Sequence, residues 1–281
     1  MATTMRDPKS WHGEAFNQAT DSSNQIHSDE MAQAYGFRGG LVPGVTVSAY
    51  LMHPAVVAWG EQWLSAGHAE VVVAKPLYDG YAFDVMVDEL DERSYRATLI
   101  DQEGTRCATG TMRLPETVPS PPVRRGDPLL ARGETVPPVS REVLERFRVE
   151  GMRALPARWS ADNHMASYLA DPAAMPHIHR FDGAGLANGG FLLGLTNWVL
   201  AGNTYMNPWV HVQTESQFYA TVAPDTGLLV ECAVADLFER RGHQFVDARV
   251  DVYERETDNA VMSATLRAIY RLRPPKAPTS S

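Results

Sequence analysis

The 281-residue sequence predicts an α+β protein of two related halves, each with a curved antiparallel sheet around a buried helix. Three observations predict this class. A proline-rich segment divides the chain into halves of similar size, each half contains a glycine-rich loop followed by an apolar helical stretch, and strand-like runs follow each stretch. A chain of this length can bury one hydrophobic core in each of two domains.

The proline-rich segment follows the first half. Proline fixes φ and has no N–H donor, so a high proline density is incompatible with helices and sheet interiors. We therefore expect residues 115–140 to be a linker that crosses a surface, between an N-terminal domain at residues 1–114 and a C-terminal domain at residues 141–281. Its seven prolines are Pro115, Pro119, Pro121, Pro122, Pro128, Pro137 and Pro138.

The glycine-rich loops repeat along the chain. Gly40-Leu41-Val42-Pro43-Gly44 and Gly185-Leu186-Ala187-Asn188-Gly189 have the same glycine spacing and lie 145 positions apart. The stretches that follow, residues 45–59 and 190–201, are apolar on nearly all sides, which is typical of a buried helix. Pro54 lies inside the first stretch, so we expect it to kink that helix or to begin a second one that runs to about Trp63.

Three strand-like runs follow each helical stretch. The alternation of apolar and polar residues in RATLID and ARVDVY is typical of a half-buried antiparallel sheet. A buried helix wrapped by a strongly curved antiparallel sheet is the hot-dog arrangement, so the predicted fold class is an α+β double hot-dog. The runs are residues 70–77, 81–90 and 95–114, with a turn at Gln102-Glu103-Gly104, and then 210–222, 228–238 and 244–272, with a turn near Asp258-Asn259.

Composition excludes several other classes. The net charge of −9 argues against a nucleic-acid partner, because phosphate binding needs a positive surface. No apolar run has the length of a transmembrane helix, and the N-terminus lacks the apolar core of a signal peptide, so we expect a cytoplasmic protein without a membrane partner. Cys107 and Cys232 are expected to be buried free thiols.

A histidine pair precedes the second glycine-rich loop. His177 and His179 would share a face on a strand, but two ligands are not a metal site, so we expect no metal. We expect instead that these histidines line the cleft between the halves or pair with Asp182.

A polar loop precedes the first helical stretch. It carries Asn24 and His27 and leads into a short helix from Asp29 to Tyr35, which Ser28 or Asp29 can cap. A helix N-terminus presents unpaired N–H groups, so the N–H of Gly44 can bind a thioester oxygen as it gains negative charge. His27 can move a proton near neutral pH.

This loop resembles the signature of the MaoC-like (R)-specific enoyl-CoA hydratases and dehydratases, which is roughly Gly-Asp-x-Asn-Pro-apolar-His. Asn24, Ile26 and His27 match its Asn, apolar residue and His, and Gly44 falls at the position of the oxyanion-binding glycine. The strings IHSDEMAQAYGFRGGLVPGV, PWVHVQTESQF and DLFERRGHQFVD also resemble uncharacterised double hot-dog members. The resemblance implies a hydro-lyase that acts on enoyl or 3-hydroxyacyl thioesters of coenzyme A or a carrier protein, with no cofactor beyond the thiol carrier of the substrate.

The loop departs from the signature at two places. Gln25 replaces the proline, and Ser22 stands where the catalytic Asp belongs, with Asp21 one position too early. Either a one-residue bulge brings Asp21 into place, or the acid is missing. In the second case a cyclase, isomerase or thioesterase reaction, or acyl-thioester binding without catalysis, becomes the alternative.

The second half lacks the Asn-x-Ile-His loop, so we expect one catalytic centre per chain with pocket walls from the second half. The expected partners are an acyl thioester and, as a further candidate, an acyl carrier protein, in a monomer or homodimer. The predicted catalytic residues are His27, Asp21, Gly44 and Asn24, and the predicted substrate-binding residues are Ser22, Gly39, Gly40, Val42, Asn188 and Gly189.

Overall fold

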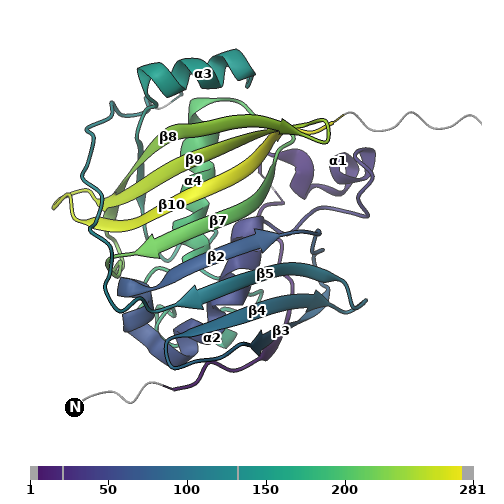
Figure 1. Cartoon of the computed structure of the whole chain (residues 1–281), viewed down its shortest axis with the longest axis vertical. Helices are drawn as coiled ribbons and strands as arrows, with labels where there is room; N and C mark the ends of the chain where they lie inside the picture. The colour runs from purple at the N-terminus through teal and green to yellow at the C-terminus, as the bar shows by residue number, and fades with distance from the viewer. Residues whose placement is uncertain (1–5, 21, 132, 274–281) are drawn as a thin grey trace, which may run out of the picture.

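The computed structural model describes residues 6–20, 22–131 and 133–273 (Figure 1). Ten antiparallel strands form one sheet in these residues. The strands are β1 (Trp11–Glu14), β2 (His68–Val73), β3 (Ala82–Asp88), β4 (Ser94–Asp101), β5 (Arg106–Arg113), β6 (Leu155–Arg158), β7 (Val210–Phe218), β8 (Gly227–Arg240), β9 (His243–Glu254) and β10 (Ala260–Arg271). The helices are η1 (Gln25–His27), α1 (Asp29–Ala34), α2 (Gly44–Ala66), α3 (Arg141–Glu150), η2 (Pro172–Ala174) and α4 (Gly189–Asn203).

The strand order shows two copies of one motif. It runs β1-β3-β4-β5-β2 and then β7-β10-β9-β8-β6, so each strand of the first half has a counterpart at the mirrored position. The fold is the expected double hot-dog, and the strands after each helix fall in the runs predicted from alternation. The two predicted sheets, however, join edge to edge into one, because β2 pairs with β7 from His68 opposite Gln217 to Val72 opposite Gln213. Because β2 and β7 pair with each other, neither of these two strands presents an open edge to another chain.

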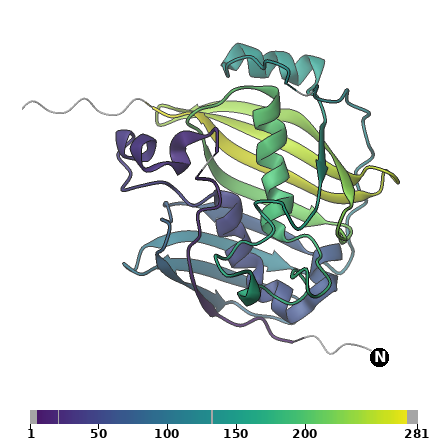
Figure 2. The ribbon, with the colours of Figure 1, turned by 180° about the vertical axis from the view of Figure 1, so that it is seen from behind.

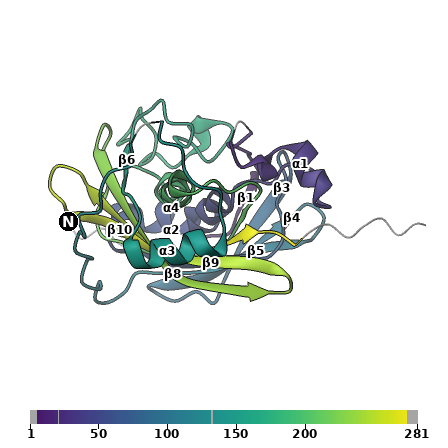
Figure 3. The same ribbon diagram turned by 90° about the horizontal axis from the view of Figure 1, so that it is seen from above.

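The two long helices lie side by side on the same face of the sheet (Figures 2 and 3). Both are buried on nearly all sides, as the sequence predicts, because the sheet covers one side and the coil before α4 covers the other. Their close approach depends on glycine. A Cβ on Gly189 would lie 2.6 Å from Cε of Met52, and one on Gly190 would lie 3.4 Å from Cβ of Ala49.

The break in α2 differs from the prediction. The helix continues through Pro54, and its non-helical φ of 53° falls at Gly60. Pro54 has no N–H for the carbonyl of Tyr50, and Nε1 of Trp11 donates to this carbonyl instead, at 3.1 Å. An external donor therefore satisfies the carbonyl that proline leaves free.

The next position of α2 is held in a similar way. The Tyr95 hydroxyl accepts from the Ala55 N–H at 3.1 Å and donates to the Leu51 carbonyl at 2.8 Å. An uninterrupted helix would pair these two backbone groups with each other. Because Tyr95 is fully buried on β4, it ties this part of α2 to the sheet.

The proline-rich segment is anchored by a buried carboxylate. Between β5 and α3 the described residues form no helix or strand. Glu231 on β8, with no exposed surface, accepts from the N–H groups of Arg125 at 2.7 Å, Gly126 at 2.7 Å and Asp127 at 3.0 Å. Arg125 also donates to Asp251 on β9 at 3.2 Å. These bonds hold the segment against the second half of the sheet.

Helix α3 follows this segment and was not predicted. Ser140 caps it by accepting from the Val143 N–H at 3.2 Å, and Leu144 is its buried contact. The helix packs against β8 at the end of the sheet (Figure 1). Among the described residues, no helix combines the length and apolar character needed to cross a lipid bilayer.

We expect Glu231→Ala to lower the free energy of unfolding by at least about 3 kcal/mol, because it leaves three backbone N–H groups and nearby arginines without their acceptor. Urea denaturation monitored by circular dichroism measures this loss. The matched control is Glu239→Ala at an exposed position of the same strand, with an expected change within about 0.5 kcal/mol. Equal midpoints for both variants would contradict the anchoring role.

Candidate active site

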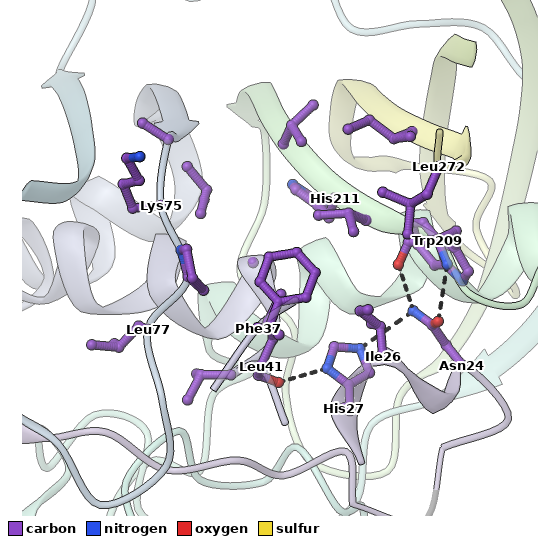
Figure 4. A pocket seen from close by; sticks show the side chains of 18 of the residues that line it. Asn24, Ile26, His27, Phe37, Leu41, Lys75, Leu77, Trp209, His211 and Leu272 are labelled. Atoms are coloured by element: carbon purple, nitrogen blue, oxygen red, sulfur yellow. Dashed lines mark hydrogen bonds between the residues drawn. The ribbon is translucent and has the colours of Figure 1, made fainter. Parts of the chain in front are cut away.

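His27 is mostly buried in η1, with one ring nitrogen committed to the backbone. Its Nδ1 lies 2.7 Å from the carbonyl oxygen of Leu41, so Nδ1 carries the proton and donates it (Figure 4). The unprotonated Nε2 therefore faces the opposite side of the ring. Burial lowers the pKa of His27 below its usual 6.5, and the bond to Leu41 opposes this effect only in part. The side chain is thus neutral near pH 7, with an unprotonated Nε2.

The glycine-rich loop packs against the backbone of His27. The Gly40 N–H donates to Asp29 at 2.8 Å, and a Cβ on Gly40 would lie 2.1 Å from the His27 carbonyl oxygen. Asn17 donates to the same carbonyl at 3.0 Å. A Cβ on Gly39 would lie 2.9 Å from Asp29. Gly39 and Gly40 thus hold the loop, and neither lines the cavities beside His27, where they were expected to bind substrate.

Asn24 links the His27 loop to the second half. Its Nδ2 donates to the Trp209 carbonyl at 3.0 Å, and its Oδ1 accepts from the Trp209 N–H at 3.1 Å. The Nδ2 also lies 3.5 Å from Nε2 of His27 (Figure 4). Asn24 is therefore next to the proton-transfer atom, while both ends of its amide are held by backbone.

The replacement of proline by Gln25 has a structural reason. The Gln25 N–H donates to Oδ1 of Asn207 at 2.9 Å, and Nδ2 of Asn207 donates to the Gln25 side chain at 2.9 Å. Proline has no N–H and could not form the first bond. Gln25 and Asn24 together give the loop four hydrogen bonds to residues 207–209.

The start of α2 provides unpaired donors. Pro43 precedes the helix and gives no side-chain cap, and within the described residues the N–H groups of Gly44 and Val45 have no hydrogen-bond partner. Gly44 lines a cavity together with Val42 and His27. A Cβ on Gly44 would lie 3.1 Å from the carbonyl oxygen of His211, so only glycine allows β7 this close. The positive end of the helix dipole points to the same place.

Two cavities meet at His27. The first has a volume of about 220 Å³ and the second about 400 Å³, and residues of both halves line each. They share four lining residues, which are Asn24, His27, Asn197 and Trp209. These four residues therefore border both cavities.

Among the residues predicted for the site, Asp21 is the candidate for the acidic partner of His27. Asp21 lies outside the described residues. Ser22 is exposed, lines the second cavity, and accepts from the Asn24 N–H at 3.1 Å. No carboxylate is among the described residues that line either cavity. The described part of the site thus supplies imidazoles and the helix N-terminus but no carboxylate.

The second half contains a closed counterpart of this arrangement. Nδ1 of His179 donates to the Leu186 carbonyl at 2.9 Å, and Leu186 precedes Gly189 by three residues, as Leu41 precedes Gly44. Asn188, however, caps α4 by accepting from the Phe191 N–H at 3.0 Å. Neither Asn188 nor Gly189 lines the two cavities, since one caps the helix and the other packs against α2. The prediction that Asn188 and Gly189 bind substrate therefore has no support from their positions.

The two histidines before α4 also differ from expectation. His177 is exposed and His179 is 1% exposed, in a turn and not in a strand, so they share no face. Asp182 pairs with Arg180 through the two side chains.

Sequence reasoning missed a polar group on the opposite wall. Asn197 on α4 lines both cavities, and its Oδ1 lies 3.0 Å from Nδ1 of His211 on β7. Nε2 of His211 bonds to the Thr214 hydroxyl. The motif string quoted above contains His211 and Thr214, but a histidine on a strand has no pattern that predicts its partner.

No family model and no curated protein matches this sequence. Solved structures do match. A conserved hypothetical protein from Mycobacterium tuberculosis, described as having a double hot-dog fold, superposes with a TM-score of 0.54 at 15% identity, over 93% of this chain and 96% of that chain. A protein from Chloroflexus aurantiacus, described as a MaoC domain dehydratase, has a TM-score of 0.54 at 11% identity, over 97% and 99%.

A third match, to a protein from Thermobifida fusca described as a thioesterase II, has a TM-score of 0.50 at 14% identity, over 94% and 95%. At these identities the likeness shows the fold alone. The chain is therefore a double hot-dog protein over nearly its full length.

Buried histidines make a prediction for stability. Burial lowers the pKa of His53 and of His179 to about 4 and that of His211 to about 3. Each folded pKa lies below the unfolded value of about 6.5, so stability is fully present above pH 6.5 and falls as pH drops toward 4. At pH 5 each histidine should cost about 2 kcal/mol.

Urea denaturation at pH 8, 6.5 and 5 measures this dependence. His179→Gln should reduce the slope of the unfolding free energy between pH 6.5 and 5 by about one proton. The control is Met86→Gln at an exposed position of β3, which removes no titratable group and should leave the slope unchanged. An unchanged slope in His179→Gln would show that this histidine does not titrate as its burial implies.

Proposed function

We propose that this protein is an enzyme of acyl thioesters and that it interconverts enoyl and 3-hydroxyacyl thioesters of coenzyme A or a carrier protein. The observation that carries the proposal is one cavity lined by a neutral His27 with an unprotonated Nε2 and by the uncapped start of α2. A base and an oxyanion donor on one cavity are what α-proton chemistry beside a thioester requires.

In the proposed reaction, the Gly44 N–H and Nε2 of His27 have separate roles. The thioester oxygen accepts from the Gly44 N–H, where the helix dipole stabilises the charge of an enolate. In dehydration, Nε2 of His27 takes the proton from C2, and the resulting imidazolium gives it to the hydroxyl that leaves C3 as water. Hydration is the reverse: water adds to C3, its proton passes to Nε2, and then to C2. In this scheme Asn24 orients the substrate or water beside Nε2.

Asp21 is the proposed acidic partner of His27. Its neighbour Ser22 lines the second cavity, and dehydration needs an acid at the C3 hydroxyl. A carboxylate there would share the proton transfer to and from the C3 hydroxyl. We expect Asp21→Asn to lower kcat strongly if this role holds and to leave it within twofold if His27 works alone.

A thioesterase is the second candidate. The described residues that line the cavities contribute no carboxylate, and hydrolysis needs only one base to activate water and one donor for the carbonyl oxygen. The neighbours described as a dehydratase and as a thioesterase support a thioester enzyme of either kind. Release of free thiol from acyl-CoA, followed with a thiol reagent, would favour hydrolysis.

Coenzyme A or phosphopantetheine would enter as part of the substrate. The exposed Lys75 at the edge of the first cavity offers a positive charge for its phosphates, as would suit either carrier (Figure 4). We propose a monomer or homodimer, since the pairing of β2 with β7 joins two hot-dog units within one chain.

We expect His27→Ala to lower kcat/KM for hydration of crotonyl-CoA and longer enoyl-CoAs by at least about 100-fold, because it removes the base. Loss of absorbance of the conjugated thioester measures the rate. The control is His12→Ala at an exposed position, which should match wild type. No hydration of any enoyl-CoA by wild type, or a His27→Ala variant as active as wild type, would overturn the hydratase proposal.

The pH profile tests the protonation state of His27. Its pKa is lowered by burial, so the neutral base persists below pH 6.5. We expect kcat/KM to stay constant from pH 8 to 6.5 and to decline only at lower pH as Nε2 becomes protonated. Measurements between pH 5 and 8 check this, and a decline that begins above pH 6.5 would contradict a buried neutral base.

A further inference from the structure

Asn197 presents a free donor to the cavities. It lies on α4, in the second half, and lines both cavities at the point where they meet, as His27 does in the first half. Its Oδ1 is bonded to His211, and its Nδ2 has no hydrogen-bond partner among the described residues. The amide therefore has one end held by protein and the other end open to a ligand.

Two residues hold this amide in one orientation. Nδ1 of His211 faces an acceptor, the Oδ1 of Asn197, so Nδ1 carries the proton of the neutral ring. Nε2 must then accept, and the Thr214 hydroxyl donates to it. His211 is buried, and its burial keeps it neutral near pH 7. With Oδ1 of Asn197 on His211, the Nδ2 group is the end of the amide that remains for the cavities.

The second cavity combines polar and apolar lining residues. Its described lining residues include no Asp, Glu, Lys or Arg. Ser23 and His164, which also line it, are exposed, and the ring of Trp198 lies 5.2 Å from that of His164. A saturated aliphatic chain that covers Asn197 would displace water from its Nδ2 without offering an acceptor, which is unfavourable.

We propose that the second cavity takes an acyl group that carries a hydroxyl or carbonyl oxygen on its chain, and that the Asn197 amide donates to this oxygen. This inference rests on the proposed acyl-thioester function and names its substrate class. The thioester lies at Gly44 and His27, and the oxygenated part of the acyl group extends past His27 to Asn197. His211 and Thr214 are positioning residues, since they act through the amide.

Unreactive ligands test this preference apart from catalysis. The probes are coenzyme A thioethers with a ketone in place of the thioester, one with a plain saturated chain and a series with one hydroxyl at successive chain carbons beyond C3. In calorimetry we expect wild type to bind at least one hydroxylated member about tenfold or more tightly than the plain chain. His27→Ala should keep this preference, because the imidazole does not bind the distal oxygen.

Variants at three positions test which residue causes the preference for hydroxylated chains. Asn197→Leu, or Asn197→Ser if the leucine variant loses its native circular dichroism spectrum, should abolish it. Thr214→Val should weaken it, and Thr214→Ser should retain it because the hydroxyl remains. Gln62→Leu replaces an exposed amide of α2 and should behave as wild type.

The outcomes separate the two proposals. Binding of plain and hydroxylated chains with equal affinity overturns the inference and leaves the acyl-thioester function intact. A preference that survives both Asn197 variants also overturns it. Binding of none of the thioethers overturns the inference and the acyl-thioester function together.

Discussion

The pairing of β2 with β7 is the contact on which the site depends. It joins two half-sheets into one and sets the register between the two halves. The proline-rich segment connects the halves in sequence but does not set this register. With β2 and β7 side by side, the backbone of His211 comes against Gly44 at the start of α2. The residues just before β7 then meet the His27 loop, so that Asn24 can pair with Trp209. A shift of this register would separate the base, the helix start and the opposite wall.

The two halves share one architecture but use it differently. In each, a histidine donates to a leucine carbonyl just before the buried helix. Asn188 caps α4 by accepting from the Phe191 N–H, whereas Pro43 gives α2 no side-chain cap. The glycines at the two helix starts also differ in their surroundings: Gly44 lines a cavity next to β7, and Gly189 packs against Met52 of α2. The packing around each helix start therefore distinguishes the candidate site from its counterpart in the second half.

Desolvation governs both the chemistry and the stability. Burial lowers the pKa of His27, so the Nε2 that acts as the base in the proposed reaction is unprotonated near pH 7. The same effect on His53, His179 and His211 makes folding unfavourable at acid pH, because the unfolded chain can take up the protons that these sites refuse. A site that needs an uncharged imidazole thus ties the working pH range of the protein to neutral and alkaline conditions.

The sequence by itself determined the local features: the linker, the two glycine-to-helix junctions, the strands that alternate, and the loop with Asn24 and His27. These depend on periodicity, proline and glycine within about ten residues. It did not predict the short strands β1 and β6, whose hydrogen bonds come from distant segments, or helix α3. Tertiary structure alone decided that the break in α2 falls at Gly60, that Gln25 binds Asn207, and that Asn197 lines the same cavities as His27. The groups that these residues contact come from distant parts of the chain or from another element. No local sequence pattern predicts such contacts, because the fold brings the groups together and their spacing in the sequence does not.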